Sequence, residues 1–360
     1  MSLLEDARKQ INKVDEEMAE LFETRMKAVD DVIRYKQAHQ MKVLDTSREQ
    51  QIITHNVEYI QNEQYKDSYI QFIKEMMEIS KKYQRCLINK ECVGYAGVKG
   101  AFSHIASERL FLDNKKKNYA TFEEVFQAVC DKEIAYGVIP FENSYTGEVG
   151  EVLDLLSQYK VYINEIYDLK ISQNLLGIKG AKLEDIKQVY SKDQAIYQSK
   201  EFLNGRGYEL IPYPNTALAA EYVAKCQDKT KAAIAASENA SLYGLDILAS
   251  DINTSNQNTT RFIVISDALI KQGNVFSLTF IVHHKAGSLV EAMNVIAKYG
   301  FNMQSIKSRS IKKRPWEYYF YVEIAGDLNN SKEQQMVEEL RAICEEVKIV
   351  GSYQKESRDE

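Results

Sequence analysis

Residues 4–36, LEDARKQINKVDEEMAELFETRMKAVDDVIRYK, decide how the first part of the chain folds. No glycine or proline interrupts them, and their apolar side chains recur three and four positions apart, which is the spacing of one face of an α-helix. A helix of this size is about 50 Å long at about 1.5 Å per residue. One small monomer cannot bury an apolar stripe of that length, so we predict that the helix pairs with a second chain.

The distribution of helix-breaking residues separates this part from the rest of the chain. All 16 glycines and all 4 prolines lie at or beyond Gly94. Before that point, the capping segment Asp45–Glu49 predicts the start of a second helix, and the apolar period over about Asp67–Cys86 predicts a third. Residues 1–88 are therefore expected to form an all-α domain.

Two other patterns follow the helical part. Strands and helices alternate between residues 91 and 268, which predicts an α/β domain with two lobes, including one helix over Gln194–Leu203. From residue 274 to 356 the order becomes strand, helix, strand, strand, helix, strand, a ferredoxin-like βαββαβ pattern. We therefore predict a multidomain chain with three domains.

The composition argues against several classes of protein. A net charge of −6 and a pI near 5.6 leave no basic surplus for a general nucleic-acid binder. No apolar run approaches the roughly 20 residues that span a bilayer, and no secretory leader pattern is present, so we expect a cytoplasmic protein without membrane contacts. The five cysteines and five histidines lack disulfide or metal-ligand spacing, so we expect reduced thiols and no metal.

Two cations interrupt the apolar stripe of the first helix. Arg25 and Lys36 are 11 residues apart, about three helical turns, so they share a face. A cation on a buried face is costly unless it meets an anion, although its side chain can also reach out to water. Further polar residues accumulate in the helical part, which makes a bound anion the better explanation for the two cations. These residues are Arg8, Asp45, Arg48, Glu49, Ser80 and Gln84.

These eight positions resemble the motif of the helical AroQ-type chorismate mutases. The resemblance implies a pericyclic rearrangement of chorismate to prephenate, which needs charge stabilisation but no nucleophile or cofactor. It also implies roles for each residue: Arg8, Arg25 and Arg48 hold carboxylates, Lys36 and Gln84 donate to the ether oxygen, Asp45 and Glu49 orient the ring hydroxyl or order the cations, and Ser80 assists carboxylate binding.

The spacing within the first helix adds a constraint on that site. Arg8 and Arg25 are 17 residues apart on one helix, or about 25 Å, which is too far for both to hold one small molecule. If both residues act in one site, Arg8 comes from a second protomer. The active unit is then an intertwined dimer.

Four polar clusters lie where strands and helices alternate in residues 91–268. They begin near Pro140, Asn215, Ser237 and Asn258. Capping of helices by Ser, Thr and Asn explains each cluster separately, but α/β folds also bind ligands at such switch points. The run Gly94-Tyr-Ala-Gly97-Val-Lys-Gly100 lacks dinucleotide spacing, so tight turns explain it better than a phosphate site.

The segments Pro140-x-Glu-Asn-Ser-x-x-Gly147, Asn215-Thr-x-x-Ala-Ala220 and Thr260-Arg-Phe262 resemble the prephenate dehydratase family over about Val93–Ser266. The resemblance implies two α/β lobes around a cleft, similar to type II periplasmic binding proteins, and the conversion of prephenate to phenylpyruvate without a metal or organic cofactor. Thr260 would lie nearest the leaving hydroxyl, and Arg261 would organise the cleft or the substrate carboxylate. The remaining pocket residues would be Phe262, Glu142, Asn143, Ser144, Asn215, Thr216 and Ser103.

The sequence departs from the family at two positions. Gln173 and Lys192 stand where the family often has histidine. Both lie outside the Thr260–Phe262 segment, so the departures bear on substrate detail and leave the reaction expectation in place.

The βαββαβ region resembles an ACT domain, the amino-acid-sensing module that usually ends prephenate dehydratases. The family's effector loop appears as Gly287-Ser288-Leu289-Val290, and its Glu-Ser-Arg-Pro motif is reduced to Ser308 and Arg309 between Lys307 and Ser310. The resemblance implies inhibition by L-phenylalanine. A dimerisation module with weakened ligand affinity is the alternative.

Together these features predict a bifunctional enzyme of phenylalanine biosynthesis. It would use chorismate and prephenate as substrates and assemble as a homodimer or, through two kinds of interface, a tetramer. The alternative is a chorismate mutase fused to a sensor that binds an aromatic acid without turnover.

Overall fold

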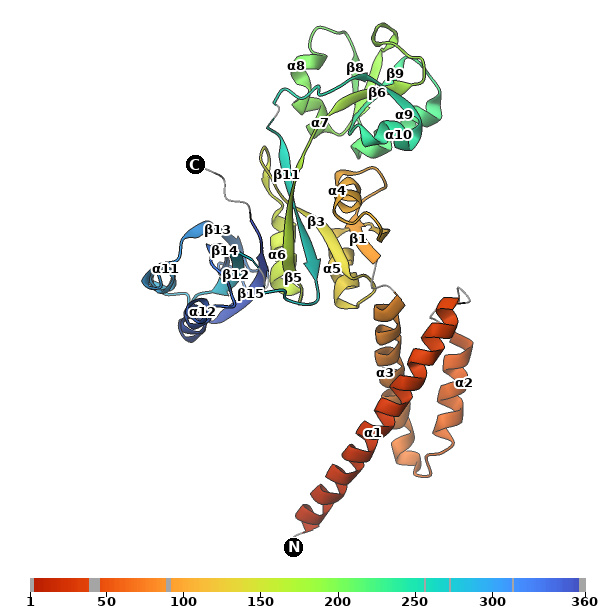
Figure 1. The fold of residues 1–360 in the computed structure, drawn as a ribbon, viewed down its shortest axis with the longest axis vertical. Helices are drawn as coiled ribbons and strands as arrows, with labels where there is room; N and C mark the ends of the chain where they lie inside the picture. The colour runs from red at the N-terminus through yellow and green to blue at the C-terminus, as the bar shows by residue number, and fades with distance from the viewer. Residues whose placement is uncertain are drawn as a thin grey trace. The chain divides into compact units, whose positions relative to one another are not determined.

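The computed structural model describes residues 3–38, 46–88, 92–255, 257–271, 273–312 and 314–355. The chain divides into two compact units, Met1–Glu91 with Asp131–Ile134 and Cys92–Cys130 with Ala135–Glu360 (Figure 1). Within the described ranges, no helix combines the length and the apolar character needed to cross a membrane.

The first unit is helical, as predicted. It consists of α1 (Leu3–Ala38), α2 (Thr46–Val57) and α3 (Glu63–Ile88). Val29 and Ile33 of α1 are buried, as are Ile73 and Met77 of α3, and the two helices are in contact.

Much of the apolar stripe of α1 is exposed, as judged over the residues that the structure describes. Leu4 is 58% exposed, Ile11 57% and Leu21 68%. On α3, Phe72 is 43% exposed and Ile79 53%. The partner chain expected to cover this stripe stays a prediction.

The second unit begins with a lobe built on a mixed sheet, which we call the first lobe. Its strands run in the order β5-β11-β3-β1-β2, with β4 on β3. The helix α4 packs Ile105 and Ala106 against Phe262 and Val264 of β11, while α5 and α6 also contact the sheet. The elements are β1 (Cys92–Ala96), α4 (Phe102–Leu110), β2 (Lys115–Tyr119), α5 (Phe122–Cys130), β3 (Tyr136–Asn143), β4 (Gly147–Glu148), α6 (Gly150–Gln158), β5 (Tyr162–Lys170) and β11 (Thr259–Ser266).

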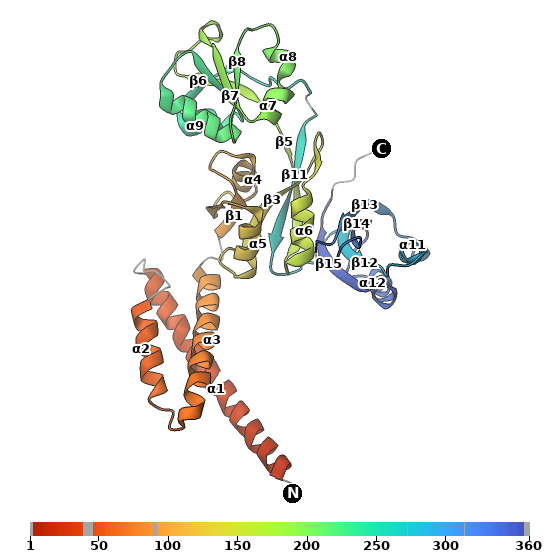
Figure 2. The ribbon, with the colours of Figure 1, turned by 180° about the vertical axis from the view of Figure 1, so that it is seen from behind.

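The second lobe has its own five-stranded sheet in the order β10-β6-β9-β7-β8. The chain enters it after β5 and leaves it before β11 (Figure 2). The elements are β6 (Asn174–Ile178), β7 (Gln188–Ser191), α7 (Asp193–Gln198), α8 (Lys200–Leu203), β8 (Glu209–Pro212), α9 (Thr216–Cys226), β9 (Lys231–Ala235), α10 (Glu238–Tyr243) and β10 (Leu245–Ala249). The single helix expected over Gln194–Leu203 was wrong, because the helix ends at Ser199 and restarts.

The remaining elements confirm the predicted βαββαβ order. They are β12 (Val275–Ile281), α11 (Ser288–Lys298), β13 (Met303–Ser310), β14 (Tyr318–Ala325), α12 (Ser331–Ile343) and β15 (Glu346–Tyr353), with the strands in the order β13-β14-β12-β15. This sheet continues into that of the first lobe because β15 pairs in parallel with β5 at Gly351 and Ile163. A Cβ at position 351 would collide with the carbonyl oxygen of Ile163, so glycine permits the close approach.

Candidate active sites

Thr260 lies at the start of β11, opposite Asn143 at the end of β3. The Asn143 Nδ2 donates to Thr260 Oγ1 and to Asn258 Oδ1, each at 2.8 Å. The Asn143 Oδ1 accepts from the backbone nitrogens of Tyr145, at 2.9 Å, and Thr146, at 3.1 Å. Because the Asn143 amide already donates to the Thr260 oxygen, the threonine O–H proton remains available for a substrate oxygen.

Ser144 lies in the hairpin formed by β3 and β4 and connects that hairpin to β11. Its Oγ donates to the Gln257 carbonyl oxygen and accepts from the Thr259 backbone nitrogen, both at 3.0 Å. The hydroxyl thus fixes the backbone on which Thr260 sits. Its place beside Thr260 agrees with the sequence expectation, although its role here is structural.

Asn258 joins this group although it was not among the predicted site residues. Only 3% of its surface is exposed, and its Nδ2 has no hydrogen-bond partner in the described part of the chain. An unpaired buried donor costs about 1–3 kcal/mol, so this amide suits an incoming substrate oxygen. In the sequence, the position of Asn258 two residues before Thr260 was the signal that could have placed it at the site.

Arg261 does not share the face of Thr260, since successive side chains of a strand point to opposite faces. Its guanidinium holds Asp168 of β5 with two hydrogen bonds, at 2.8 and 2.7 Å. Hydrogen bonding to Asp168 raises the pKa of Arg261 above its ordinary value. The arginine therefore braces two strands, and a direct hold on the substrate carboxylate is not supported.

Two other expected pocket residues also lie elsewhere. Phe262 is fully buried in the core beneath α4, so its side chain packs in that core. Glu142 is opposite Arg261 in the ladder and its Oε1 lies 3.1 Å from the Nζ of Lys307 in β13. Both residues were expected at the site from the family motif, which does not indicate the direction of each side chain.

Asn215, Thr216 and Ser103 lie at helix N-termini. The Asn215 Oδ1 caps α9, accepting from the Ala217 nitrogen at 2.7 Å, as expected. Thr216 is the first residue of α9, and Ser103 is buried in the first turn of α4. Helix N-termini carry partial positive charge and bind anions.

The two helix N-termini meet across the lobes. Gly100, just before α4, has φ +86, and a Cβ there would lie 3.2 Å from the Cβ of Ala217 in α9. Asn239 Nδ2 donates to the Gly100 carbonyl oxygen at 3.0 Å. Gly100 therefore makes a tight turn, as expected, and brings the lobes together. The expected capping by Ser237 was wrong, since its hydroxyl bonds Glu238 Oε2 at 3.2 Å instead.

In the helical unit, Arg25 and Ser80 come together. The Arg25 Nη1 donates to the Oγ of the buried Ser80 on α3, and that hydroxyl donates to the Met76 carbonyl oxygen at 2.9 Å. Arg8 is exposed on the same continuous helix as Arg25. Lys36 lies on α1, Arg48 and Glu49 on α2, and Gln84 on α3, but the structure does not describe their side chains. Asp45 lies outside the described residues.

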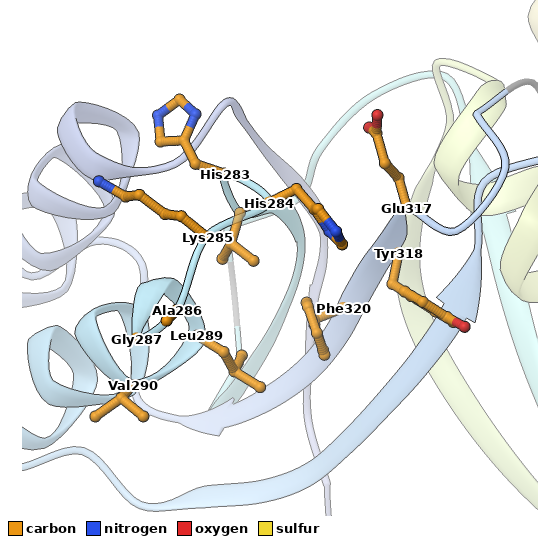
Figure 3. Close-up of a pocket in the computed structure, with 11 residues that line it drawn as sticks. His283, His284, Lys285, Ala286, Gly287, Leu289, Val290, Glu317, Tyr318 and Phe320 are labelled. Carbon is orange, nitrogen blue, oxygen red and sulfur yellow. The ribbon is translucent and has the colours of Figure 1, made fainter.

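A cavity of about 420 Å³ lies in the βαββαβ region. Gly287, Leu289 and Val290 line it, so three residues of the expected effector loop reach one pocket. In Figure 3 Leu289 and Phe320 lie toward each other, while Lys285 and Glu317 lie on opposite sides of the view and the Lys285 side chain extends away from Glu317. Ser288 is buried beside the loop and does not line the cavity.

The other expected effector residues lie apart from this cavity. Arg309 makes two hydrogen bonds to Asp154 of α6, at 3.2 and 3.1 Å, and Ser308 pairs with Phe320 in the sheet. Neither Ser308 nor Arg309 lines the pocket, which corrects the expectation of one effector set within the chain.

Strand β14 contacts both the cavity and the first lobe. Tyr318 and Phe320 line the cavity. Tyr319, between them, donates to Asp154 Oδ1 at 2.9 Å, and the Tyr321 ring lies 5.6 Å from that of Phe141. Residues on one face of β14 thus line the cavity, and residues on its other face contact the first lobe, which carries Thr260.

Comparisons with known proteins find family matches for both the helical part and the α/β part of the chain. The prephenate dehydratase family profile matches residues 93–269, and the type II chorismate mutase profile matches residues 7–85. The bifunctional chorismate mutase/prephenate dehydratase of Aquifex aeolicus is 29% identical, with 99% of each chain covered. Arogenate dehydratase/prephenate dehydratase 1 of Arabidopsis thaliana is 31% identical, covering 74% of this chain and 72% of the plant protein.

Solved structures resemble the second unit. A prephenate dehydratase from Arthrobacter aurescens in complex with L-Phe has a TM-score of 0.67 at 23% identity, covering 73% of this chain and 90% of that one. GqqA, described as a novel type of quorum quenching acylase, has the same TM-score at 26% identity, covering 73% and 97%. The shared fold therefore hosts more than one described activity, and the assignment here depends on site residues and family membership.

Proposed function

The chain belongs to the prephenate dehydratase family, and from that premise we propose how its side chains serve the two reactions of a bifunctional enzyme of phenylalanine biosynthesis. Its chorismate mutase domain rearranges chorismate to prephenate. Its prephenate dehydratase domain converts prephenate to phenylpyruvate, CO2 and water. The first product is thus the second substrate.

The hydrogen bond from Asn143 to Thr260 carries the dehydratase proposal. With its oxygen held by the amide, the Thr260 hydroxyl donates a hydrogen bond to the C4 hydroxyl of prephenate and passes on to it a proton taken up from solvent, so that the group leaves as water and the threonine stays neutral. The electron pair of the bond to the departing carboxylate moves into the ring, which becomes aromatic. The converging N-termini of α4 and α9 offer positive dipoles for the two carboxylates, and the Asn258 Nδ2, which has no hydrogen-bond partner among the described residues, offers a donor.

The mutase proposal is carried by the contact between Arg25 and Ser80. Together they present one oriented guanidinium for a carboxylate of chorismate. Because Arg8 lies about 25 Å along the same helix, we propose that Arg8 of a second protomer completes the site. The exposed stripe of α1 would then be covered in an intertwined dimer, and a second interface would make a tetramer.

A reaction assay tests the two activities together. The full chain is expected to convert chorismate to phenylpyruvate, with prephenate as the intermediate, as followed by ultraviolet absorbance and by chromatography of quenched samples. Accumulation of prephenate without phenylpyruvate would instead support the sensor alternative for the second unit. Failure to consume chorismate would contradict the mutase assignment.

The βαββαβ region is proposed to be an ACT domain that binds L-phenylalanine. Its cavity pairs apolar side chains, including Leu289 and Phe320, with Lys285 and Glu317, which suits an aromatic ring together with a carboxylate and an ammonium group. The L-Phe complex of the Arthrobacter relative supports this ligand class. Strand β14 offers a route from the cavity to the first lobe through Tyr319 and Asp154.

Millimolar L-phenylalanine is expected to raise the melting temperature of the second unit and to inhibit dehydratase turnover in the wild-type chain. Val290→Asp puts a carboxylate on the exposed wall of the cavity and should abolish both responses. Leu112→Asp makes a comparable change at an exposed site in the first lobe and should retain them. A wild-type chain that does not respond would leave dimerisation as the role of this region.

A further inference from the structure

Lys307 of β13 reaches from the βαββαβ region onto the hairpin that carries Asn143. Its Nζ lies 3.1 Å from Glu142 Oε1, 3.7 Å from Glu148 Oε2 and 5.1 Å from the centre of the Phe141 ring. The side chain is only 13% exposed. Burial of an ammonium group is costly unless anions meet it, and here two carboxylates do.

The two carboxylates need that cation. Glu142 and Glu148 are direct partners in the antiparallel pair of β3 and β4, and like charges directly opposite each other destabilise such a pair. In the described parts of the chain, Lys307 is the one cation within 4 Å of either group. The segment between these two glutamates contains Asn143, at the end of β3, and Ser144, which hold Thr260 and its backbone.

We propose that Lys307 is a positioning residue for the dehydratase site. It neutralises the facing pair Glu142 and Glu148, closes the hairpin and thereby aims the Asn143 amide at the Thr260 hydroxyl. The proposal rests on the dehydratase mechanism given above. It also gives a role to the position at which the sequence departs from the effector motif of ACT domains: the lysine there serves the active site of the neighbouring lobe.

The attachment of β13 to the first lobe does not depend on Lys307 alone. Two residues along the strand, Arg309 holds Asp154 of α6, and Tyr319 holds the same carboxylate. Burial by itself would raise the pKa of Asp154, but the hydrogen bonds from Arg309 and Tyr319 hold that pKa below its ordinary value. Removal of the Lys307 charge should therefore disturb the hairpin and leave β13 docked.

The test uses Lys307→Met in the full chain, with mutase turnover as an internal measure of folded enzyme. Dehydratase kcat should fall about tenfold to a hundredfold, as small misplacements of reacting groups do, with a smaller change in KM and no change in mutase rate. Lys307→Arg should keep most of the turnover. Lys312→Met, at a lysine 71% exposed and 3.4 Å from Asp154, is the matched control and should behave as wild type.

A double variant separates charge neutralisation from simple packing. Adding Glu148→Gln to Lys307→Met removes the repulsion between the facing carboxylates and should recover most of the lost kcat. Wild-type kinetics for Lys307→Met, or a loss that Glu148→Gln does not reduce, would overturn the role of Lys307. A wild-type chain with no dehydratase turnover would overturn the underlying mechanism instead, so the two failures are distinguishable.

Discussion

Replacement of Thr260 by alanine is expected to lower dehydratase kcat by about a hundredfold or more, the usual contribution of a positioned proton donor. The Thr260 hydroxyl accepts from Asn143 at 2.8 Å and so has its proton directed elsewhere. Alanine removes that proton and leaves the Asn143 Nδ2 with the Asn258 Oδ1 and the Thr259 carbonyl oxygen as its acceptors. Mutase turnover on the same chain should stay at the wild-type rate, because Thr260 belongs to the other unit.

The matched control is Thr259→Ala, which makes the same chemical change one residue earlier on β11. Its side chain points to the other face of the strand, and its backbone contacts with Ser144 remain in the variant. Steady-state kinetics with purified prephenate should show a large loss for Thr260→Ala and a small one for Thr259→Ala. Equal losses in both variants would mean that the strand, and not the hydroxyl, supports the reaction.

Local patterns predicted most of the elements, for identifiable reasons. The α1 stripe lacks breakers over its full length, and the βαββαβ region alternates strongly between periods of two and of about 3.6 residues. The pattern failed where local preference and tertiary context differ. Lys115–Tyr119, with three lysines in five residues, forms the edge strand β2 beside β1.

The motif resemblance placed Asn143 and Thr260 in one group, and the structure brings these two residues together. Asn143 and Thr260 are 117 residues apart and form a direct hydrogen bond. Strand alternation also implies that Thr260 and Arg261 face opposite ways, which the motif alone obscured. The contact between Lys307 and Glu142 has no local signal, since it joins the βαββαβ region to the first lobe across 165 positions of the chain.

The second prediction of large effect concerns the mutase site. Arg8→Ala and Arg25→Ala should each lower mutase kcat by about a hundredfold or more, the usual cost of removing a group that stabilises charge in the transition state. If the two arginines of one site come from different protomers, chains that carry the two substitutions complement each other. Co-refolding of the two variants should make half of the dimers hybrids. Each hybrid then has one intact site and one site that lacks both arginines, so about a quarter of wild-type activity should return.

A second mixture provides the control. Arg25 and Ser80 hold each other within one chain, so a hybrid of Arg25→Ala with Ser80→Ala has a damaged residue in each site and should show no recovery. Dehydratase turnover, measured on the same samples, normalises the amount of folded protein. If mutase activity returns when Arg25→Ala is mixed with Arg8→Ala, but not when it is mixed with Ser80→Ala, then Arg25 and Arg8 of one site belong to different protomers. Failure of both mixtures would contradict the shared site, and the exposed stripe of α1 would then need a different occupant.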